Sequence, residues 1–290
     1  MAGFKKIKIK HIFILPTVLI LFAFGIFPAV ASLLLSFTNF SLAKVGEGFS
    51  FVGLTNYLRL FSDARFILSM RNTFIYVILG VGFQYIVGMF LAMLIYEETK
   101  INKFYRVVFL IPIMLTPVAI GYTWRMMLHG TYGPINHLLS IINLPGIPWL
   151  SSTIVAPLAI MLVDFWQWTP FMILALLAGR MSISPEYYEA AGVDGASKAQ
   201  VFAYITFPIL LPVSLTVILI RAIEVAKIVD IIYVLTGGGP GVSTESITLY
   251  GYISGVKQFN LGYASSIAYT ILVAIMVFGF IFLRLKERFK

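Results

Sequence analysis

Long runs of uncharged, apolar residues constrain this chain more than any other feature of its sequence. A helix that crosses a bilayer needs about 20 mostly apolar residues, since each residue adds about 1.5 Å. Of the 290 residues, 60% are hydrophobic and only 11% are charged, whereas about 25% are charged in an ordinary soluble domain. That is too little charge to cover a soluble globule. The composition therefore excludes a soluble enzyme or a nucleic-acid-binding domain.

Six segments have the length and apolarity of membrane-spanning helices, and they predict an all-α membrane protein. They are apolar on all sides, as contact with lipid requires. The predicted spans are residues 12–37, 72–96, 106–128, 153–178, 206–232 and 262–284. The predicted organisation is an N-terminal segment at 1–11, a six-helix domain at 12–284 that includes a long loop at 179–205, and a tail at 285–290.

The first span has a second interpretation, as a cleaved signal peptide. Four lysines between positions 5 and 10 precede its apolar stretch, and Ala29-Val30-Ala31 is typical of a signal-peptidase site. However, the apolar stretch is longer than a usual signal core and continues through Leu33–Leu35, beyond that site. We therefore favour an uncleaved anchor.

The distribution of Lys and Arg predicts the orientation of the chain in the membrane. Cytoplasmic connections accumulate these residues, which also accounts for the net charge of +9 without nucleic acid. If the N-terminus is inside, 13 of the 21 Lys and Arg residues lie in inner segments and five in outer ones. Both termini are therefore expected in the cytoplasm.

The sequence offers little for catalysis or metal binding. It has no cysteine, and His129 and His137 have no companions that would complete a metal site. Neither His-Glu-x-x-His nor Gly-x-Ser-x-Gly occurs. We therefore expect no metal, no catalytic residue and no enzyme activity in this chain.

The inner loop at 179–205 is longer than a simple connection between two spans needs to be. Ser184 before Pro185, with Glu in the first turn, is a helix-start pattern. The helix is expected to break at Gly195, where left-handed backbone carries no steric cost. A second short helix would then lead through Ile205 into the fifth span.

The spacing of residues in this loop resembles a known motif. The loop reads Glu189-Ala190-Ala191, three residues, Gly195, nine residues, then Ile205-x-x-Pro208. This resembles the EAA loop of bacterial binding-protein-dependent ABC importers, with Phe207 where the family pattern has Leu. Three further stretches are similar to the sugar-uptake branch, of the maltodextrin-permease type: Phe51–Tyr57, Asp194–Ser197 and Leu235–Pro240.

The resemblance implies a type I ABC importer permease with six transmembrane helices in the bacterial cytoplasmic membrane. The implied partners are a second homologous permease subunit, two ATPase subunits, an extracytoplasmic solute-binding protein, a sugar substrate and membrane lipid, with no nucleic acid. This chain would bind no cofactor, because ATP and Mg would sit on the partner ATPase. Its own Gly-rich run at 237–241 lacks the Gly-Lys-Ser/Thr of a phosphate loop. In the family, the residues matching Glu189, Ala190, Ala191 and Gly195 dock on the ATPase and transmit its movement.

Polar residues inside the spans are candidates for a substrate pathway, because an intramembrane charge is costly. Asp164, Gln167, Trp168 and Phe171 recur at helical spacing and so share a face. A carboxylate, an amide and aromatic rings on one face are typical of a sugar site. The alternative is structural: the rings fill the bundle and Asp164 pairs with a neighbouring helix.

The fifth span carries Arg221, Glu224, Lys227 and Asp230 three residues apart, which predicts either a self-neutralising ladder of i,i+3 pairs or a substrate surface. The resemblance places substrate contacts at Asp164, Gln167, Trp168 and Phe171, and at Arg221, Glu224 and Val225. The charges depart from the mostly neutral maltodextrin pattern, so an acidic or more polar saccharide is also open. A second function, ion-coupled transport with Asp164 or Glu224 as the proton site, is opposed by the EAA-like loop.

Overall fold

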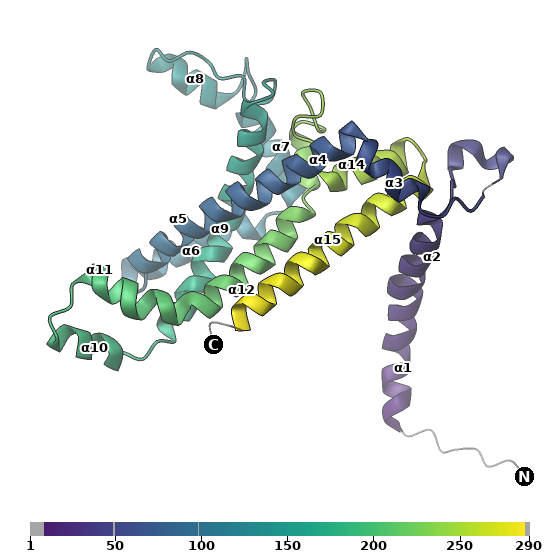
Figure 1. Cartoon of the computed structure of the whole chain (residues 1–290). Helices are drawn as coiled ribbons and strands as arrows, with labels where there is room; N and C mark the ends of the chain where they lie inside the picture. The colour runs from purple at the N-terminus through teal and green to yellow at the C-terminus, as the bar shows by residue number, and fades with distance from the viewer. Residues whose placement is uncertain (1–8, 49, 98, 288–290) are drawn as a thin grey trace, which may run out of the picture. The chain divides into compact units, whose positions relative to one another are not determined.

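The computed structural model describes residues 9–48, 50–97 and 99–287, and most of the predicted N-terminal segment and part of the tail lie outside them. Apart from one antiparallel bridge between Thr38 and Phe51, the regular structure of these residues is helical. The helices in Figure 1 are α1 (Ile9–Leu21), α2 (Phe27–Ser36), α3 (Thr55–Ser62), α4 (Ala64–Ile75), α5 (Gly82–Leu94), α6 (Lys100–Met114), α7 (Pro117–Met127), α8 (Pro134–Ile141), α9 (Val155–Met181), α10 (Glu186–Val193), α11 (Lys198–Val201), α12 (Phe207–Ala226), α13 (Asp230–Leu235), α14 (Ile247–Tyr252) and α15 (Leu261–Glu287).

Short π-helical turns join several of these helices into longer rods. They are η1 (Phe22–Ile26), η3 (Tyr76–Val81) and η4 (Phe202–Thr206), with η5 (Ile253–Lys257) after α14 and a 3₁₀ helix, η2 (Leu42–Glu47), after α2. Within the described residues, five helices are long and apolar enough to cross a membrane: Phe13–Ser36, Ala64–Leu94, Val155–Met181, Lys198–Ala226 and Leu261–Arg284. The pair α6–α7 makes a sixth if it counts as one span. The predicted all-α membrane fold is confirmed.

The third span differs from the prediction of one helix at 106–128. It begins earlier, at Lys100, and α6 and α7 meet at an angle of 96°. Leu115 and Thr116 between them are extended, with ψ of 145° and 141°. A residue that precedes proline avoids the helical region, and the Thr116 hydroxyl caps α7 by accepting from the Ala119 N–H. The chain therefore starts a new helix at Pro117.

The fifth span and the inner loop also differ from their predicted bounds. The predicted second short helix is α11, which is continuous with η4 and α12, so the rod runs from Lys198 to Ala226 and not over 206–232. Ser197 and Gln200 form a capping box that starts this rod. Gly195, at φ +69°, makes the corner after α10 as predicted.

The chain divides into two compact units, of which the first comprises Met1–Asp63 and Gly251–Ile271. Its described part is held by polar contacts around the Phe51–Tyr57 stretch. The Asn56 amide donates to the backbone oxygens of Ser36 and Thr38, both at 2.8 Å, and Ser36 and Tyr57 share a hydroxyl hydrogen bond of 2.7 Å. A Cβ at Gly262 would lie 2.2 Å from the Thr38 oxygen, so only glycine fits there.

The second unit comprises Ala64–Tyr250 and Leu272–Lys290. In it α9 packs against α5, α6, α7 and α12. Two glycines allow close approach: a Cβ at Gly88 would lie 2.6 Å from Met172 Cβ, and one at Gly179 would lie 2.9 Å from Leu210 Cδ2. Because interiors are close-packed, α5, α9 and α12 form one tightly fitted layer.

Candidate functional site

A polar cavity of about 190 Å³ lies within the second unit, bordered by α7, α9, α12 and the segment that leads into α13. Five of its ten lining residues are charged, in a chain with very few charges: Pro117, Asp164, Trp168, Arg221, Glu224, Lys227, Ile228, Val229, Asp230 and Ile231. Four residues of the predicted substrate pathway, Asp164, Trp168, Arg221 and Glu224, are thus brought to one cavity.

Two charged residues of the cavity, Asp164 and Arg221, form a buried triad with the side-chain amide of Gln84. Arg221 Nη2 donates to Asp164 Oδ2 at 2.8 Å, with the two side chains 2% and 7% exposed. Gln84, from α5, donates through Nε2 to the same oxygen at 2.6 Å and accepts from Arg221 Nε at 3.1 Å. The Trp168 ring stacks against the guanidinium, 4.8 Å from its centre. Three helices therefore meet at one closed ring of hydrogen bonds.

The triad is half-saturated, which means that only part of its hydrogen-bonding capacity is used. Both hydrogen bonds to Asp164 use Oδ2, and within the described residues Oδ1 receives none. Likewise, Arg221 uses Nε and Nη2, and Nη1 has no partner in the described part of the chain. Both residues line the cavity, so it keeps one strong acceptor and one strong donor available for a guest molecule.

The predicted i,i+3 ladder on the fifth span is only partly formed. Glu224 pairs with Lys227 at 3.0 Å, with both side chains about half exposed. Arg221, however, pairs with Asp164 on another helix, so the expected Arg221–Glu224 pair was wrong. The reason is burial: Arg221 is 2% exposed, and a buried charge needs a buried partner.

Three predicted pathway residues do not line the cavity. Gln167 is buried, and its amide donates to the Leu115 oxygen at 3.3 Å, at the break between α6 and α7. Its Oε1 has no partner in the described residues. Phe171 is half-buried and Val225 is buried, both away from the cavity lining. Helical spacing placed Gln167 beside Asp164, but the freed carbonyl at the α6–α7 break turns its amide elsewhere.

Gln84 is the functional candidate that the sequence reasoning missed. Its side chain is fully buried in a span that otherwise contains mainly apolar residues. An amide at such a position needs hydrogen-bond partners, which is the signal that could have found it. Lys227 and Asp230 also line the cavity.

The EAA-like loop lies at the end of α9 opposite to α8 (Figure 1). Between α10 and the start of the Lys198–Ala226 rod lies a cleft of about 540 Å³. Ala190, Ala191 and Gly195 line it, whereas Glu189 is exposed beside it. The small side chains leave room for a surface to approach α10 closely.

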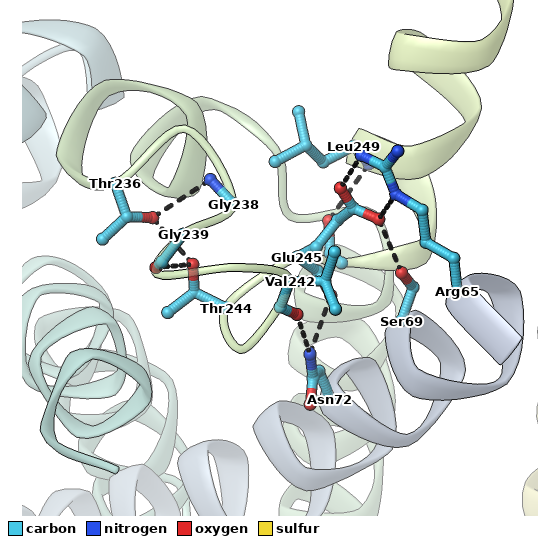
Figure 2. A network of polar contacts seen from close by, with 11 residues as sticks. Arg65, Ser69, Asn72, Thr236, Gly238, Gly239, Val242, Thr244, Glu245 and Leu249 are labelled. Carbon is cyan, nitrogen blue, oxygen red and sulfur yellow. Dashed lines mark hydrogen bonds and ion pairs between the residues drawn. The ribbon is translucent and has the colours of Figure 1, made fainter. Parts of the chain in front are cut away.

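A second polar network holds the loop after α13 to α4 (Figure 2). Glu245, which is 1% exposed, accepts from Arg65 Nε at 2.9 Å, from Arg65 Nη2 at 2.6 Å and from Ser69 Oγ at 2.9 Å. Asn72 donates to the backbone oxygens of Val242 and Glu245. The Gly-rich run at 237–241 forms a turn, with positive φ at three of its glycines.

Apolar spans around a charged cavity, with an exposed helical loop at their ends, define a membrane transport protein. The chain belongs to the family described as binding-protein-dependent transport system inner membrane components, whose pattern matches residues 84–290. It is thus a multi-pass inner-membrane transport component. The ion-coupled alternative gains no support from this family.

Named relatives extend the likeness over nearly the whole chain. The trehalose/maltose transport system permease protein MalF of Thermococcus litoralis is 36% identical, with 98% of this chain and 94% of the relative covered. The sulfoquinovosyl glycerol transport system permease protein SmoG of Agrobacterium fabrum is 32% identical, with 93% and 87% covered. The predicted permease family is therefore confirmed.

Solved structures show the same fold. A chain of a bacterial ABC transporter involved in the import of the acidic polysaccharide alginate superposes with a TM-score of 0.85 at 22% identity, covering 96% of this chain and 95% of that one. A chain of the alginate transporter in complex with its alginate pentasaccharide-bound periplasmic protein gives 0.83. The predicted type I importer permease fold is confirmed.

Proposed function

We propose that this chain is a permease subunit of an ATP-driven importer and that it carries a saccharide through the Asp164–Arg221 cavity. The observation that carries the proposal is the half-saturated triad. Asp164 and Arg221, whose Oδ1 and Nη1 have no partners in the described residues, both line one cavity together with the indole of Trp168. A sugar hydroxyl both donates and accepts hydrogen bonds, so it matches such a pair.

The balance of charge favours a neutral saccharide over an anionic one. Arg221 is already neutralised by Asp164, and Lys227 by Glu224. An anionic group would have to compete with Asp164 for the guanidinium and would meet Asp230 on the same cavity wall. A hydroxyl group would not have to compete with Asp164 for the guanidinium. The names of relatives allow either class, because they include both trehalose/maltose and sulfoquinovosyl glycerol permeases.

The energy for transport comes from outside this chain in this proposal. A second homologous permease and two ATPase subunits would complete the transporter, with ATP and Mg²⁺ bound to the ATPases. The α10 segment, with Glu189, Ala190, Ala191 and Gly195, would dock on one ATPase from the cytoplasmic side. The excess of Lys and Arg in the inner segments supports this orientation, with both termini inside. A sugar-loaded binding protein would deliver the substrate from the other side.

The proposal is tested with the assembled transporter in proteoliposomes. Uptake of radiolabelled trehalose, maltose and an anionic uronate oligosaccharide is measured with and without ATP and vanadate. We expect ATP-dependent, vanadate-sensitive uptake of a neutral disaccharide. Asp164→Asn and Arg221→Gln should each lower it by at least about tenfold, since each removes a charged hydrogen-bonding group worth about 1.5–3 kcal/mol.

Two results would overturn the proposal. Uptake driven by a proton gradient in the absence of ATP would reject the importer mechanism. ATP-driven uptake whose concentration dependence and selectivity are unchanged in both variants would reject the cavity as the pathway. Phe171→Ala serves as the matched control, because this aromatic side chain lies on α9 but outside the cavity lining.

A further inference from the structure

Tyr188, on α10 one position before Glu189, joins the EAA-like loop to the rest of the second unit. Its ring lies 3.8 Å from the Arg180 guanidinium, and Arg180 also lies 4.5 Å from the ring of Tyr96. The cation is thus held between two tyrosine rings. The Tyr188 hydroxyl forms a hydrogen bond of 3.1 Å with the Thr206 hydroxyl.

The three partners of this cluster belong to the ends of three different helices. Tyr96 lies two residues after the end of α5, Arg180 is in the last turn of α9, and Thr206 is the last residue of η4, which leads into α12. These are the same helices that carry the triad, because Gln84 is on α5, Asp164 on α9 and Arg221 on α12. One cluster therefore touches every helix that builds the triad.

An apolar core lies beside the cluster, and Tyr188 packs against it. Its buried members come from α5, α9, α12 and the residues just after α5 and α9: Met89, Ala92, Ile95, Ile173, Leu176, Leu177, Ile183 and Leu210. The close approaches at Gly88 and Gly179 lie in this stretch. Asp164 and Arg180 are 16 residues apart on α9, or roughly 24 Å along the helix axis. A core packed this closely transmits displacement with little compression.

We propose that Tyr188 is the positioning residue that couples α10 to the substrate site, by tying α10 to the three helices that hold Gln84, Asp164 and Arg221. This inference rests on the proposed function, in which an ATPase moves α10. Movement of α10 then shifts the ends of α5, α9 and α12 together and so alters the triad. Without Tyr188, α10 still docks through its exposed cleft face, but its movement no longer reaches the cavity.

The two contacts of Tyr188 are separable by substitution. Tyr188→Phe keeps the ring beside Arg180 and removes the hydroxyl that meets Thr206. Thr206→Val removes the same hydrogen bond from the other side. Tyr188→Ala removes both contacts. Phe280→Ala is the matched control, because Phe280 stacks with Arg284 at 5.0 Å on α15 and its side chain is 60% exposed.

The experiment measures ATP hydrolysis and saccharide uptake in the same proteoliposomes and reports the ATP consumed per molecule transported. For Tyr188→Ala we expect hydrolysis to persist and this ratio to rise by at least about tenfold, equivalent to losing about 1.4 kcal/mol of coupling. Tyr188→Phe and Thr206→Val should raise it about two- to threefold and equally. Phe280→Ala should leave it unchanged.

The inference is overturned if Tyr188→Ala keeps the wild-type ratio. It is also overturned if Tyr188→Phe and Thr206→Val keep that ratio while Tyr188→Ala loses hydrolysis and uptake in parallel, because Tyr188 would then serve assembly alone. A wild-type transporter without ATP-driven uptake would instead reject the proposed function itself. The two failures are therefore distinguishable in one series of samples.

Discussion

Two ion pairs with a buried carboxylate, both in the described part of the chain, differ in how completely their hydrogen-bonding atoms are used. Glu245 has both oxygens occupied, by the two-pronged Arg65 contact and by Ser69. Asp164 receives both of its hydrogen bonds on Oδ2. The Glu245 pair is thus saturated, whereas the Asp164 pair keeps hydrogen-bonding capacity beside a cavity.

This difference separates a structural role from a functional one. A saturated buried pair fixes geometry, and breaking it leaves a buried charge without compensation. A half-saturated pair at a cavity accepts a polar guest without having to be broken. We infer that the Glu245 pair holds the loop after α13 in place and that the Asp164 pair receives substrate.

The largest effect expected from the comparison is on stability, at the saturated pair. Glu245→Ala removes the carboxylate that accepts hydrogen bonds from Arg65 and Ser69. We expect it to lower the unfolding free energy by about 2–3 kcal/mol. The loss is smaller than for a fully buried pair because the Arg65 side chain is 34% exposed. The measurement is thermal unfolding of the purified transporter in detergent. An unchanged unfolding midpoint would show that the network of Figure 2 contributes little to the free energy of unfolding.

A smaller effect is expected at Gln84, and it tests how the half-saturated pair is held in position. Gln84→Ala removes one hydrogen bond from Asp164 and one from Arg221 but keeps both charges. We expect uptake to fall about tenfold, because the pair loses about 1–2 kcal/mol of positioning. Gln84→Glu is the informative companion, since a second carboxylate beside Asp164 should be worse than alanine. If Gln84→Ala and Gln84→Glu both kept the uptake of wild type, a positioning role for Gln84 would be contradicted.

The smallest effect is expected at the exposed pair on the cavity wall. Lys227→Gln breaks a contact between side chains that are both about half exposed, and such pairs contribute about 0–1 kcal/mol. The unfolding midpoint should therefore stay within about 2 °C of wild type. A drop as large as that of Glu245→Ala would show that exposure is a poor guide to the energy of these pairs.

Much of this fold was predictable because its elements depend on local patterns. Uncharged runs gave the spans, and the Gly195 corner followed from residue type alone. The break at Leu115–Thr116 was missed because a proline in a span indicates a bend without giving its size; here two extended residues before Pro117 turned a kink into an angle of 96°.

The site was predictable only in part, for a physical reason. The sequence showed which polar residues lie inside spans, and Asp164, Trp168, Arg221 and Glu224 do line one cavity. Pairing across helices depends on tertiary contact, which helical spacing does not encode. The i,i+3 interpretation placed the partner of Arg221 on its own helix and was wrong, whereas the alternative that Asp164 pairs with a neighbouring helix agrees with the structure.

The most direct test exchanges both charges of each pair for neutral amides. One variant combines Asp164→Asn with Arg221→Gln, and the other combines Arg65→Gln with Glu245→Gln; each removes both charges of its pair. Uptake per folded molecule and the unfolding midpoint are measured for both. We predict that the first loses uptake per folded molecule by more than about tenfold, and that the second keeps its uptake per folded molecule while its midpoint falls by about 5 °C. Normal uptake in the first variant, or lost uptake per folded molecule in the second, would contradict the assignment of substrate binding to the half-saturated pair.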